Sequence, residues 1–227
     1  MKTTIPLVSG GKPMMADMYD AAEGVSQGLI VIAYGSAGLT NDLSGPWKTM
    51  IEGYAASLGD KGFGAVILDY LSITGTPPDP TVLDAMFHLR DTWQAALSDA
   101  TDQVITLSKL DPKRVGLLGF SLGGHLALRL RAKAKVLVAF FAPVLDCIGA
   151  PGTLAHAQIH HGQSDKLPDT GFPNASAIEG TLKQEGTATE LYPYPGAGHG
   201  FIGADQANQS ARDLSKARTL SFFQTNL

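Results

Sequence analysis

The chain has one cysteine, few charged residues and no long apolar run. Cys147 alone cannot form an intrachain disulfide, and it has no partner for a cysteine-rich metal site. Charged residues make up 17% and the net charge is −4, with no long basic run to neutralise phosphates, so we expect no nucleic-acid partner. No stretch approaches the roughly 20 apolar residues that span a bilayer. Residues 1–11 lack the pattern of a signal peptide, so we expect a cytoplasmic protein without a membrane partner.

The length and the apolar content favour one folded unit. The 227 residues are 44% hydrophobic, which supplies a core and excludes wholesale disorder. There is no internal repeat, and no linker rich in proline, glycine or serine divides the chain. We therefore expect a single domain over residues 1–227. The widest connection, residues 146–155, is too short for a large cap domain. The sequence allows a monomer or a homodimer.

Short apolar runs alternate with longer segments whose apolar residues recur every three or four positions. Such runs are typical of buried strands in a parallel sheet, separated by helices. The predicted strands are 29–34, 65–70, 115–120, 136–141, 157–161 and 189–194. The predicted helices are 47–58 (ended by Gly59), one from about Asp79-Pro80 to just before Asp111, then 122–131, 175–184 and 205–222. Residues 3–8 and 13–19 predict an antiparallel hairpin at the sheet edge. The pattern predicts an α/β fold with a mostly parallel sheet and helices on both faces.

A serine in a glycine-flanked turn is the first candidate for chemistry. Residues 119–123 read Gly-Phe-Ser-Leu-Gly, a match to the G-x-S-x-G pattern that places Ser121 on a tight strand-to-helix turn. A buried-strand signature precedes it and a helix signature follows it, and glycines on both sides let the two elements approach closely. A second match, centred on Ser26, lies before a strand and opens no helix, so we interpret it as a loop. The context favours Ser121 as a nucleophile over a helix-capping serine.

A serine nucleophile needs a histidine base. His199 lies in the glycine-rich loop 196–201, after the last predicted strand and before the last helix. This position is at the carboxyl edge of the sheet, where ligands bind in open α/β folds and where Ser121 is also expected. The other histidines lie in helices or around one strand and need no catalytic role: His88, His125, His156, His160 and His161.

The base in turn needs a carboxylate, and three aspartates are candidates. Asp165 follows the strand 157–161, which gives the chain order Ser, Asp, His. Asp146 also leaves a strand at the same edge and is the main competitor. Asp169 lies deeper in the Asp165 loop and is more typical of a turn. We favour Asp165.

An oxyanion hole needs two preorganised N–H donors. The backbone N–H of Leu122, directly after the nucleophile, is one candidate. The other is the N–H of Ser36, in the glycine-flanked loop that follows the strand 29–34. Residues placed near these elements are candidates to line a substrate pocket, although aromatic side chains more often pack the core: Tyr34, Gly35, Trp47, Phe120, Phe172 and Phe201.

Other patterns point away from phosphate and metal chemistry. Arg129, Arg131, Lys133 and Lys135 form a basic cluster at a helix C-terminus, where positive charge complements the helix dipole, and we interpret it as a solvated face. The sequence has neither a P-loop motif nor a strand-linked dinucleotide motif. The pair His160-His161 has no third ligand at a recognisable spacing. We expect neither a cofactor nor a metal.

Together, these motifs resemble the α/β-hydrolase superfamily and, within it, the dienelactone hydrolase-like family. The resemblance covers nearly the whole chain: the turn around Ser121, the His161-Gly162 pair with Asp165, and the Gly-His-Gly-Phe segment 198–201. It implies a single domain with a mostly parallel sheet, no metal or organic cofactor, and hydrolysis of esters or lactones through an acyl-enzyme.

The chain departs from dienelactone hydrolases proper at two positions. Those enzymes resemble this chain but carry a cysteine at the nucleophile position, where this chain has Ser121, and a glutamate in the oxyanion loop, where this chain reads Ala-Tyr-Gly-Ser at 33–36. Both departures argue against hydrolysis of dienelactone itself. Tyr34 also replaces the histidine common in related esterases, a change that leaves the backbone donor in place.

The sequence therefore predicts a serine hydrolase for small carboxylic esters or lactones. Two alternatives stay open at this point: a serine peptidase or acyltransferase that uses the same triad, and a non-catalytic protein that binds a ligand in the same pocket.

Overall fold

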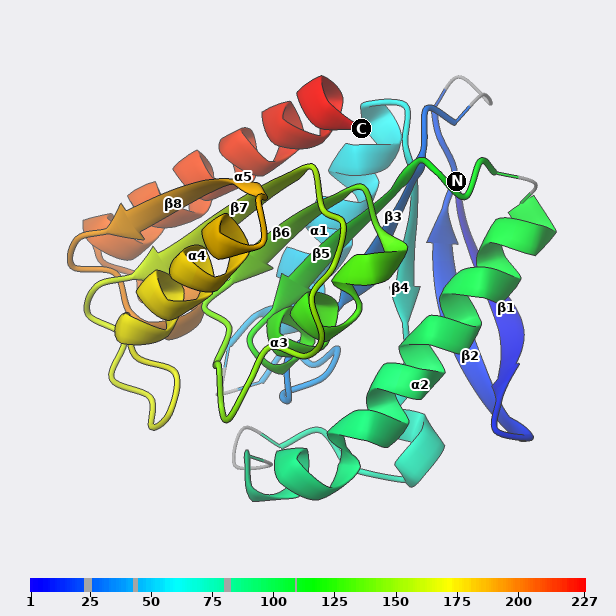
Figure 1. The fold of residues 1–227 in the computed structure, drawn as a ribbon, viewed down its shortest axis with the longest axis horizontal. Helices are drawn as coiled ribbons and strands as arrows, with labels where there is room; N and C mark the ends of the chain where they lie inside the picture. The colour runs from blue at the N-terminus through cyan, green and yellow to red at the C-terminus, as the bar shows by residue number, and fades with distance from the viewer. Residues whose placement is uncertain (23–25, 43–44, 80–82, 109) are drawn as a thin grey trace.

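An eight-stranded sheet forms the centre of the computed structural model, which describes residues 1–22, 26–42, 45–79, 83–108 and 110–227 (Figure 1). The strand order is β1-β2-β4-β3-β5-β6-β7-β8. Strands β1 and β2 pair antiparallel with each other, β2 pairs antiparallel with β4, and all other neighbours are parallel. The strands are β1 (Lys2–Ser9), β2 (Lys12–Tyr19), β3 (Leu29–Ala33), β4 (Gly64–Leu68), β5 (Val115–Phe120), β6 (Val136–Phe140), β7 (His156–Gly162) and β8 (Ala188–Tyr194). The predicted fold class is confirmed.

The sequence pattern explains both halves of this sheet. Strands β3 to β6 are apolar along their whole length and buried at every residue, as expected for central parallel strands covered on both faces. The edge hairpin β1–β2 is exposed at many positions, and its turn uses Gly10 and Gly11 at φ 54° and 77°. Glycine is suited to this turn because the left-handed region carries no Cβ penalty there.

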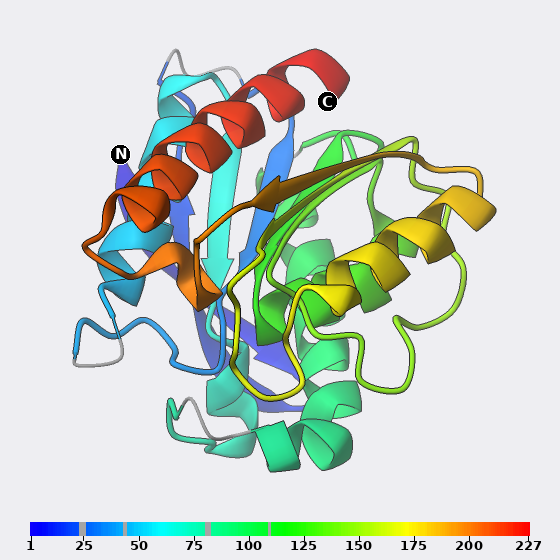
Figure 2. The same cartoon turned by 90° about the vertical axis from the view of Figure 1, so that its left-hand side faces the viewer.

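Five α-helices of the described chain cover the sheet in two layers (Figure 2). One face carries α1 (Trp47–Asp60) and α5 (Gln206–Asn226), which also contact each other. The opposite face carries α2 (Leu83–Ser108), α3 (Leu122–Arg129) and α4 (Pro173–Gln184). The described ranges also contain three short 3-10 turns: η1 (Tyr70–Thr74), η2 (Arg131–Lys133) and η3 (His199–Phe201). None of the helices that the structure describes is both long and apolar enough to cross a membrane.

Element boundaries differ from the sequence prediction at a few places. Helix α1 continues through Gly59 to Asp60, so the prediction that Gly59 ends it was wrong. Gly59 serves close packing instead, because a Cβ there would lie 3.0 Å from the carbonyl oxygen of Asp20. Helix α3 ends at Arg129 and is followed by η2, and α5 runs to Asn226 after its N-cap Asp205. The predicted helix start at Asp79-Pro80 falls partly outside the described residues, in which α2 begins at Leu83.

Candidate active site

Ser121 occupies the turn between β5 and α3 at the carboxyl edge of the sheet. Its backbone has φ 51° and ψ −118°, a conformation that costs free energy for a residue with a side chain. The turn is possible only because its neighbours are small. A Cβ on Gly119 would lie 2.4 Å from the carbonyl oxygen of Gly123, and a Cβ on Gly123 would lie 2.1 Å from that of Ala33. Both glycines of the motif are therefore required sterically, and they fix the position of Ser121.

His199 joins Ser121 to Asp165 through both of its ring nitrogens. Nε2 of His199 lies 3.1 Å from Oγ of Ser121, and Nδ1 lies 2.8 Å from Oδ2 of Asp165. The three residues come from the ends of β5, β7 and β8, which reach the same sheet edge. The loop after β8 can approach the loop after β7 because residue 162 is a glycine. A Cβ at this position would lie 2.3 Å from the carbonyl oxygen of Ala197. With its acceptor nitrogen facing the serine, His199 can take a proton from the hydroxyl.

Asp165 is held by four donors, and its side chain is fully buried. Besides His199, Oδ2 faces Nε2 of His161 at 3.0 Å. Oδ1 accepts from the backbone N–H of Leu167 at 3.0 Å and the hydroxyl of Thr170 at 3.1 Å. Burial by itself raises the pKa of Asp165, but the hydrogen bonds from His161 and His199 outweigh it and hold this pKa well below its usual range. The carboxylate is thus charged and fixed in orientation.

His161 belongs to this cluster, although the sequence analysis assigned it no role beyond its place next to Gly162. It lies on β7 four residues before Asp165, is fully buried, and packs its ring edge-on against Phe172. Its Nδ1 has no hydrogen-bond partner among the described residues. A neutral imidazole protonated on Nε2 donates to Asp165 and leaves no unpaired N–H in the interior. The signal in the sequence was its place at the end of the strand, next to Gly162 and four residues before Asp165.

The competing acid candidates lie elsewhere. Asp146 has a half-exposed side chain and pairs with the guanidinium of Arg90, whose hydrogen bonds hold the pKa of Asp146 well below its usual range. Asp169 has φ 62°, and its carbonyl accepts from the side chain of Asn174, in keeping with a turn residue.

The remaining histidines lie elsewhere in the fold and have no role at the Ser121 hydroxyl. His88 is exposed on α2 and His156 opens β7. His125 and His160 are fully buried, and burial lowers the pKa of both, that of His125 to about 4. Nδ1 of His125 faces the carbonyl oxygen of Pro143, and Nδ1 of His160 faces the hydroxyl of Tyr194. These contacts are structural.

A narrow cleft surrounds the Ser121 hydroxyl, with a volume of about 40 Å³. Gly35 brings the loop after β3 against the serine, since a Cβ there would lie 3.2 Å from Cβ of Ser121. Leu122 is the first residue of α3, so its N–H has no acceptor within the helix. The N–H of Ser121 itself is used, because it donates to the carbonyl of Phe140 at 2.9 Å. The cleft is lined by Gly35, Ser36, Ala37, Gly38, Trp47, Ser121, Leu167 and His199.

Two aromatic residues expected in this pocket are placed differently. Phe120 is fully buried and packs against Tyr54 and Phe140 in the layer between the sheet and α1. Phe201 is 2% exposed and packs against Phe141, which in turn meets the His199 ring edge-on. The alternation of side chains across the sheet turns Phe120 away from the cleft, so its assignment was wrong. Tyr34 does not line this cleft. It lines a second cavity, which shares Gly38 with the cleft.

The basic cluster is not a uniformly solvated face. Arg131 is fully buried, and its guanidinium binds Glu185 at 2.6 Å and the carbonyl of Leu128 at 2.7 Å. Arg129 pairs with Asp91, and Lys133 pairs with the exposed Asp102. The guanidinium also donates to the carbonyl of Gly149 at 3.2 Å, so Arg131 ties the connection after β6 to the helix layer. Within the described residues, no group of three or more potential metal ligands gathers at any point.

The sequence and the fold can be compared with known proteins. The family model of the dienelactone hydrolase family matches residues 29–227. The chain belongs to this family. A protein of Synechocystis sp. that carries the provisional name carboxymethylenebutenolidase is 31% identical over 170 residues, which are 65% of this chain and 67% of that relative. The sequence resemblance to the family is confirmed.

Solved structures share the fold over almost the whole chain at low identity. A dienelactone hydrolase-like promiscuous phosphotriesterase from metagenomic libraries superposes with a TM-score of 0.80 at 16% identity, covering 100% of this chain and 98% of its own. An α/β serine hydrolase without a lid from Xanthomonas campestris reaches 0.70 at 15% identity, covering 98% and 93%. The esterase domain of a Rhodothermus marinus protein reaches 0.67 at 11% identity, covering 97% and 98%. These likenesses establish the α/β-hydrolase fold.

Proposed function

We propose that this member of the dienelactone hydrolase family is a serine hydrolase that cleaves small carboxylic esters or lactones through an acyl-enzyme. The observation that carries the proposal is the hydrogen-bonded chain from Oγ of Ser121 through His199 to Asp165, with distances of 3.1 and 2.8 Å. Each link has the length that proton transfer and imidazole orientation require.

In the proposed mechanism, Oγ of Ser121 attacks the carbonyl carbon while Nε2 of His199 takes the hydroxyl proton. The N–H groups of Ser36 and Leu122 stabilise the oxyanion, aided by the N-terminus of α3. Collapse of this intermediate breaks the bond to the alcohol oxygen, which receives the proton from His199. A water molecule then repeats the sequence on the acyl-enzyme, releases the acid and restores Ser121.

Asp165 and His161 have supporting roles in this proposal. Asp165 keeps the N–H of His199 on Nδ1, so that Nε2 is free to accept from the serine, and its negative charge stabilises the imidazolium that forms. We assign His161 as a positioning residue, because its contact with Oδ2 fixes the carboxylate without touching the substrate.

Two features support small esters or lactones as the substrates. The cleft beside Ser121 holds only about 40 Å³, enough for a small acyl group. The oxyanion loop carries Tyr34 and no glutamate, and the nucleophile is a serine rather than a cysteine. The name of the Synechocystis relative denotes a lactone-opening enzyme, which keeps lactones in the proposed class.

The test uses wild-type protein and the Ser121→Ala variant. Both are incubated with a fluorophosphonate, the adduct is read by intact-mass spectrometry, and hydrolysis of p-nitrophenyl acetate and octanoate is followed. We expect one adduct at Ser121 that the variant lacks, and faster turnover of acetate than of octanoate. A folded wild-type protein that forms no adduct would contradict the proposal.

A further inference from the structure

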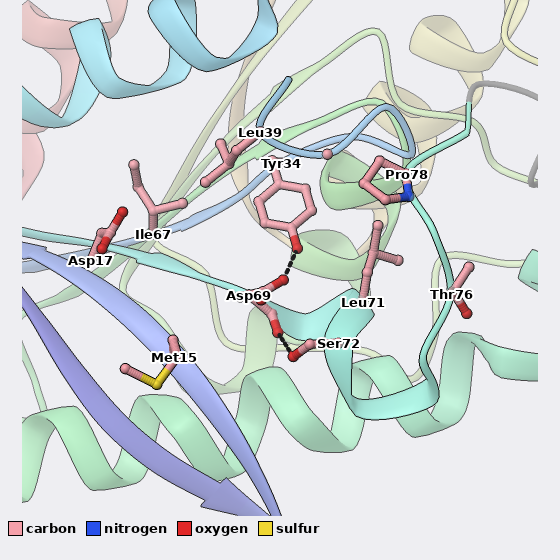
Figure 3. Close-up of a pocket in the computed structure, with 11 residues that line it drawn as sticks. Met15, Asp17, Tyr34, Leu39, Ile67, Asp69, Leu71, Ser72, Thr76 and Pro78 are labelled. Carbon is pink, nitrogen blue, oxygen red and sulfur yellow. Dashed lines mark hydrogen bonds between the residues drawn. The ribbon is translucent and has the colours of Figure 1, made fainter. Parts of the chain in front are cut away.

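A second cavity adjoins the cleft of Ser121, because Gly38 lines both, and Figure 3 shows the residues around this cavity. Its volume is about 400 Å³, against about 40 Å³ for the cleft itself. A long acyl chain needs more space than the roughly 40 Å³ of the cleft. The cavity that shares Gly38 with it is therefore an adjoining space for the rest of a substrate, and the inference that follows rests on the proposed function.

The order of the strands decides which part of an ester would enter this cavity. His199 and Asp165 reach Ser121 from the β7–β8 side, whereas the cavity lies over β4 and β2, with walls from Ile67, Asp69 and Met15. In the proposed mechanism the alcohol oxygen must face His199 to receive its proton. The acyl chain is then the part that points away from His199, past Gly38 and toward the cavity.

One carboxylate of the cavity, that of Asp69, has no cationic partner among the described residues. Asp69 is half-buried, and its Oδ1 accepts from the hydroxyl of Tyr34 at 2.6 Å, as Figure 3 shows. No lysine, arginine or histidine lies within ion-pair distance of Asp69 in the part of the chain that the structure describes. Asp17, the other acid of the lining, is different, because Lys2 pairs with it at 2.8 Å and Thr4 donates to it at 2.7 Å.

Apart from Ser72 and Thr76, the rest of the lining is mostly apolar. Met15, on β2, is 45% exposed where it lines the cavity. Leu39, Ile67, Leu71 and Pro78 form other parts of the wall, and no basic side chain is among the described residues that line it. A ligand that fits must cover apolar surface and supply a cation or hydrogen-bond donors to the Asp69 carboxylate.

We propose that this cavity is an acyl subsite that selects acyl chains ending in an ammonium group, which Asp69 binds. Strands β5, β3 and β4 are adjacent, and strands in a sheet lie about 4.8 Å apart, so Asp69 follows a strand about 10 Å from that of Ser121. An extended chain advances about 3.5 Å per three bonds. An ion pair spans up to about 4 Å of this distance, so the ammonium should lie about six bonds from the carbonyl carbon.

A neutral acyl chain of the same length is expected to be a poorer substrate. It would cover the Asp69 carboxylate and remove it from water without giving it a partner, which costs free energy. This agrees with the expected preference for acetate over octanoate. A lower rate for the neutral chain also distinguishes a subsite for a cationic chain from a simple apolar channel.

The experiment compares two p-nitrophenyl esters of equal shape. One carries 6-(trimethylammonio)hexanoate, and the other carries its carbon isostere 7,7-dimethyloctanoate. We expect the ratio of kcat/KM, cationic over neutral, to fall about fivefold in Asp69→Asn, the size of effect expected for a partly exposed ion pair. Asparagine keeps an oxygen to accept from Tyr34. The matched control is Asp60→Asn, an exposed residue at the end of α1, which changes the net charge equally and should leave the ratio unchanged.

Two further arms keep the test decisive. Met15→Lys places a competing ammonium at the exposed rim and should lower the same ratio, which covers the case in which Asp69→Asn does not fold. The ester of trimethylammonioacetate is too short to reach Asp69, so its rate relative to its isostere should not depend on Asp69.

The outcomes separate this inference from the proposed function. An unchanged ratio in folded Asp69→Asn, or an equal change for the short ester, would overturn the subsite while Ser121-dependent acetate hydrolysis persists. Acetate hydrolysis that survives in Ser121→Ala would instead overturn the proposed function.

Discussion

The loops after β6 and β7 carry the same kinds of residue and use them differently. Each leaves a parallel strand at the carboxyl edge, and each carries an aspartate whose pKa is lowered by partners. Asp165 is buried and faces two histidines, whereas the side chain of Asp146 is 51% exposed and pairs with Arg90 on α2. Each loop is also contacted by a buried histidine, His161 for one and His125 for the other.

The difference shows that a position at a strand end does not by itself bring an aspartate to His199 and Ser121. The loop after β7 turns back over the sheet edge and is tied to the loop after β8 by the bond from Ser164 N–H to the carbonyl of Ala197 at 2.9 Å. The loop after β6 instead leads outward to α2. The two acids differ in the burial of their side chains and in contact with His199, which only Asp165 makes among the two.

The largest expected effect comes from exchanging each acid for its amide. Asp165→Asn should reduce kcat for p-nitrophenyl acetate by about 10³- to 10⁴-fold, because the amide N–H₂ favours the wrong tautomer of His199. Asp146→Asn should stay within a factor of about two, since it breaks only a half-exposed ion pair. Steady-state kinetics on both variants, with circular dichroism to check folding, measure the contrast. Equal losses in the two variants would contradict the assignment of Asp165.

The second prediction concerns the histidine behind each loop. His161→Phe keeps a ring against Phe172 but removes the donor to Asp165, and we expect kcat/KM to fall about tenfold to a hundredfold through loss of orientation. The acid limb of its pH profile should move to higher pH, because a carboxylate with one donor fewer holds the protonated form of His199 more strongly. His161→Gln, which retains an N–H donor, should recover part of both effects.

A purely structural role for His161 predicts a different outcome. In that case His161→Phe and His161→Gln would lower the melting temperature and leave the shape of the pH profile unchanged. His125→Asn serves as the matched control, because it alters the buried histidine of the other loop and should not move the profile.

Much of this arrangement could be predicted from the sequence because it depends on local rules. The apolar runs fixed the strands, and the bounds of β5 are those predicted. The turn at Ser121 follows from two glycines within four residues of each other. The position of Ser121, Asp165 and His199 at one edge follows from parallel strands alone.

The parts that could not be predicted depend on contacts distant in sequence or on depth. Phe120 looks like a pocket residue beside Ser121, but it is buried between the sheet and α1, where it packs against Tyr54. In the sequence, Arg131 belongs to a basic cluster. In the fold it is buried and pairs with Glu185, which lies 54 residues away along the chain. The pairing of Tyr34 with Asp69 arises because β3 and β4 are neighbours, which the chain order does not reveal.

The smallest effect sharpens the comparison through stability rather than activity. Burial lowers the pKa of His125 to about 4, from 6.5 in an unfolded chain. Between these values the unfolded chain binds the proton and the folded protein does not, so acidification from pH 6.5 to 4 favours unfolding. From pH 7 to pH 5 this histidine should reduce the free energy of unfolding by about 2 kcal/mol.

The test is urea unfolding of wild type and His125→Asn at both pH values. Asparagine can still donate to the carbonyl of Pro143 but has no proton to gain, so the variant should lose about 2 kcal/mol less than wild type over this range. His160 is also buried with a lowered pKa and remains in the variant, so part of the acid sensitivity should persist. His88→Asn, on the exposed side of α2, should behave as wild type. An identical pH dependence in wild type and His125→Asn would show that the buried histidine of the loop after β6 does not govern stability.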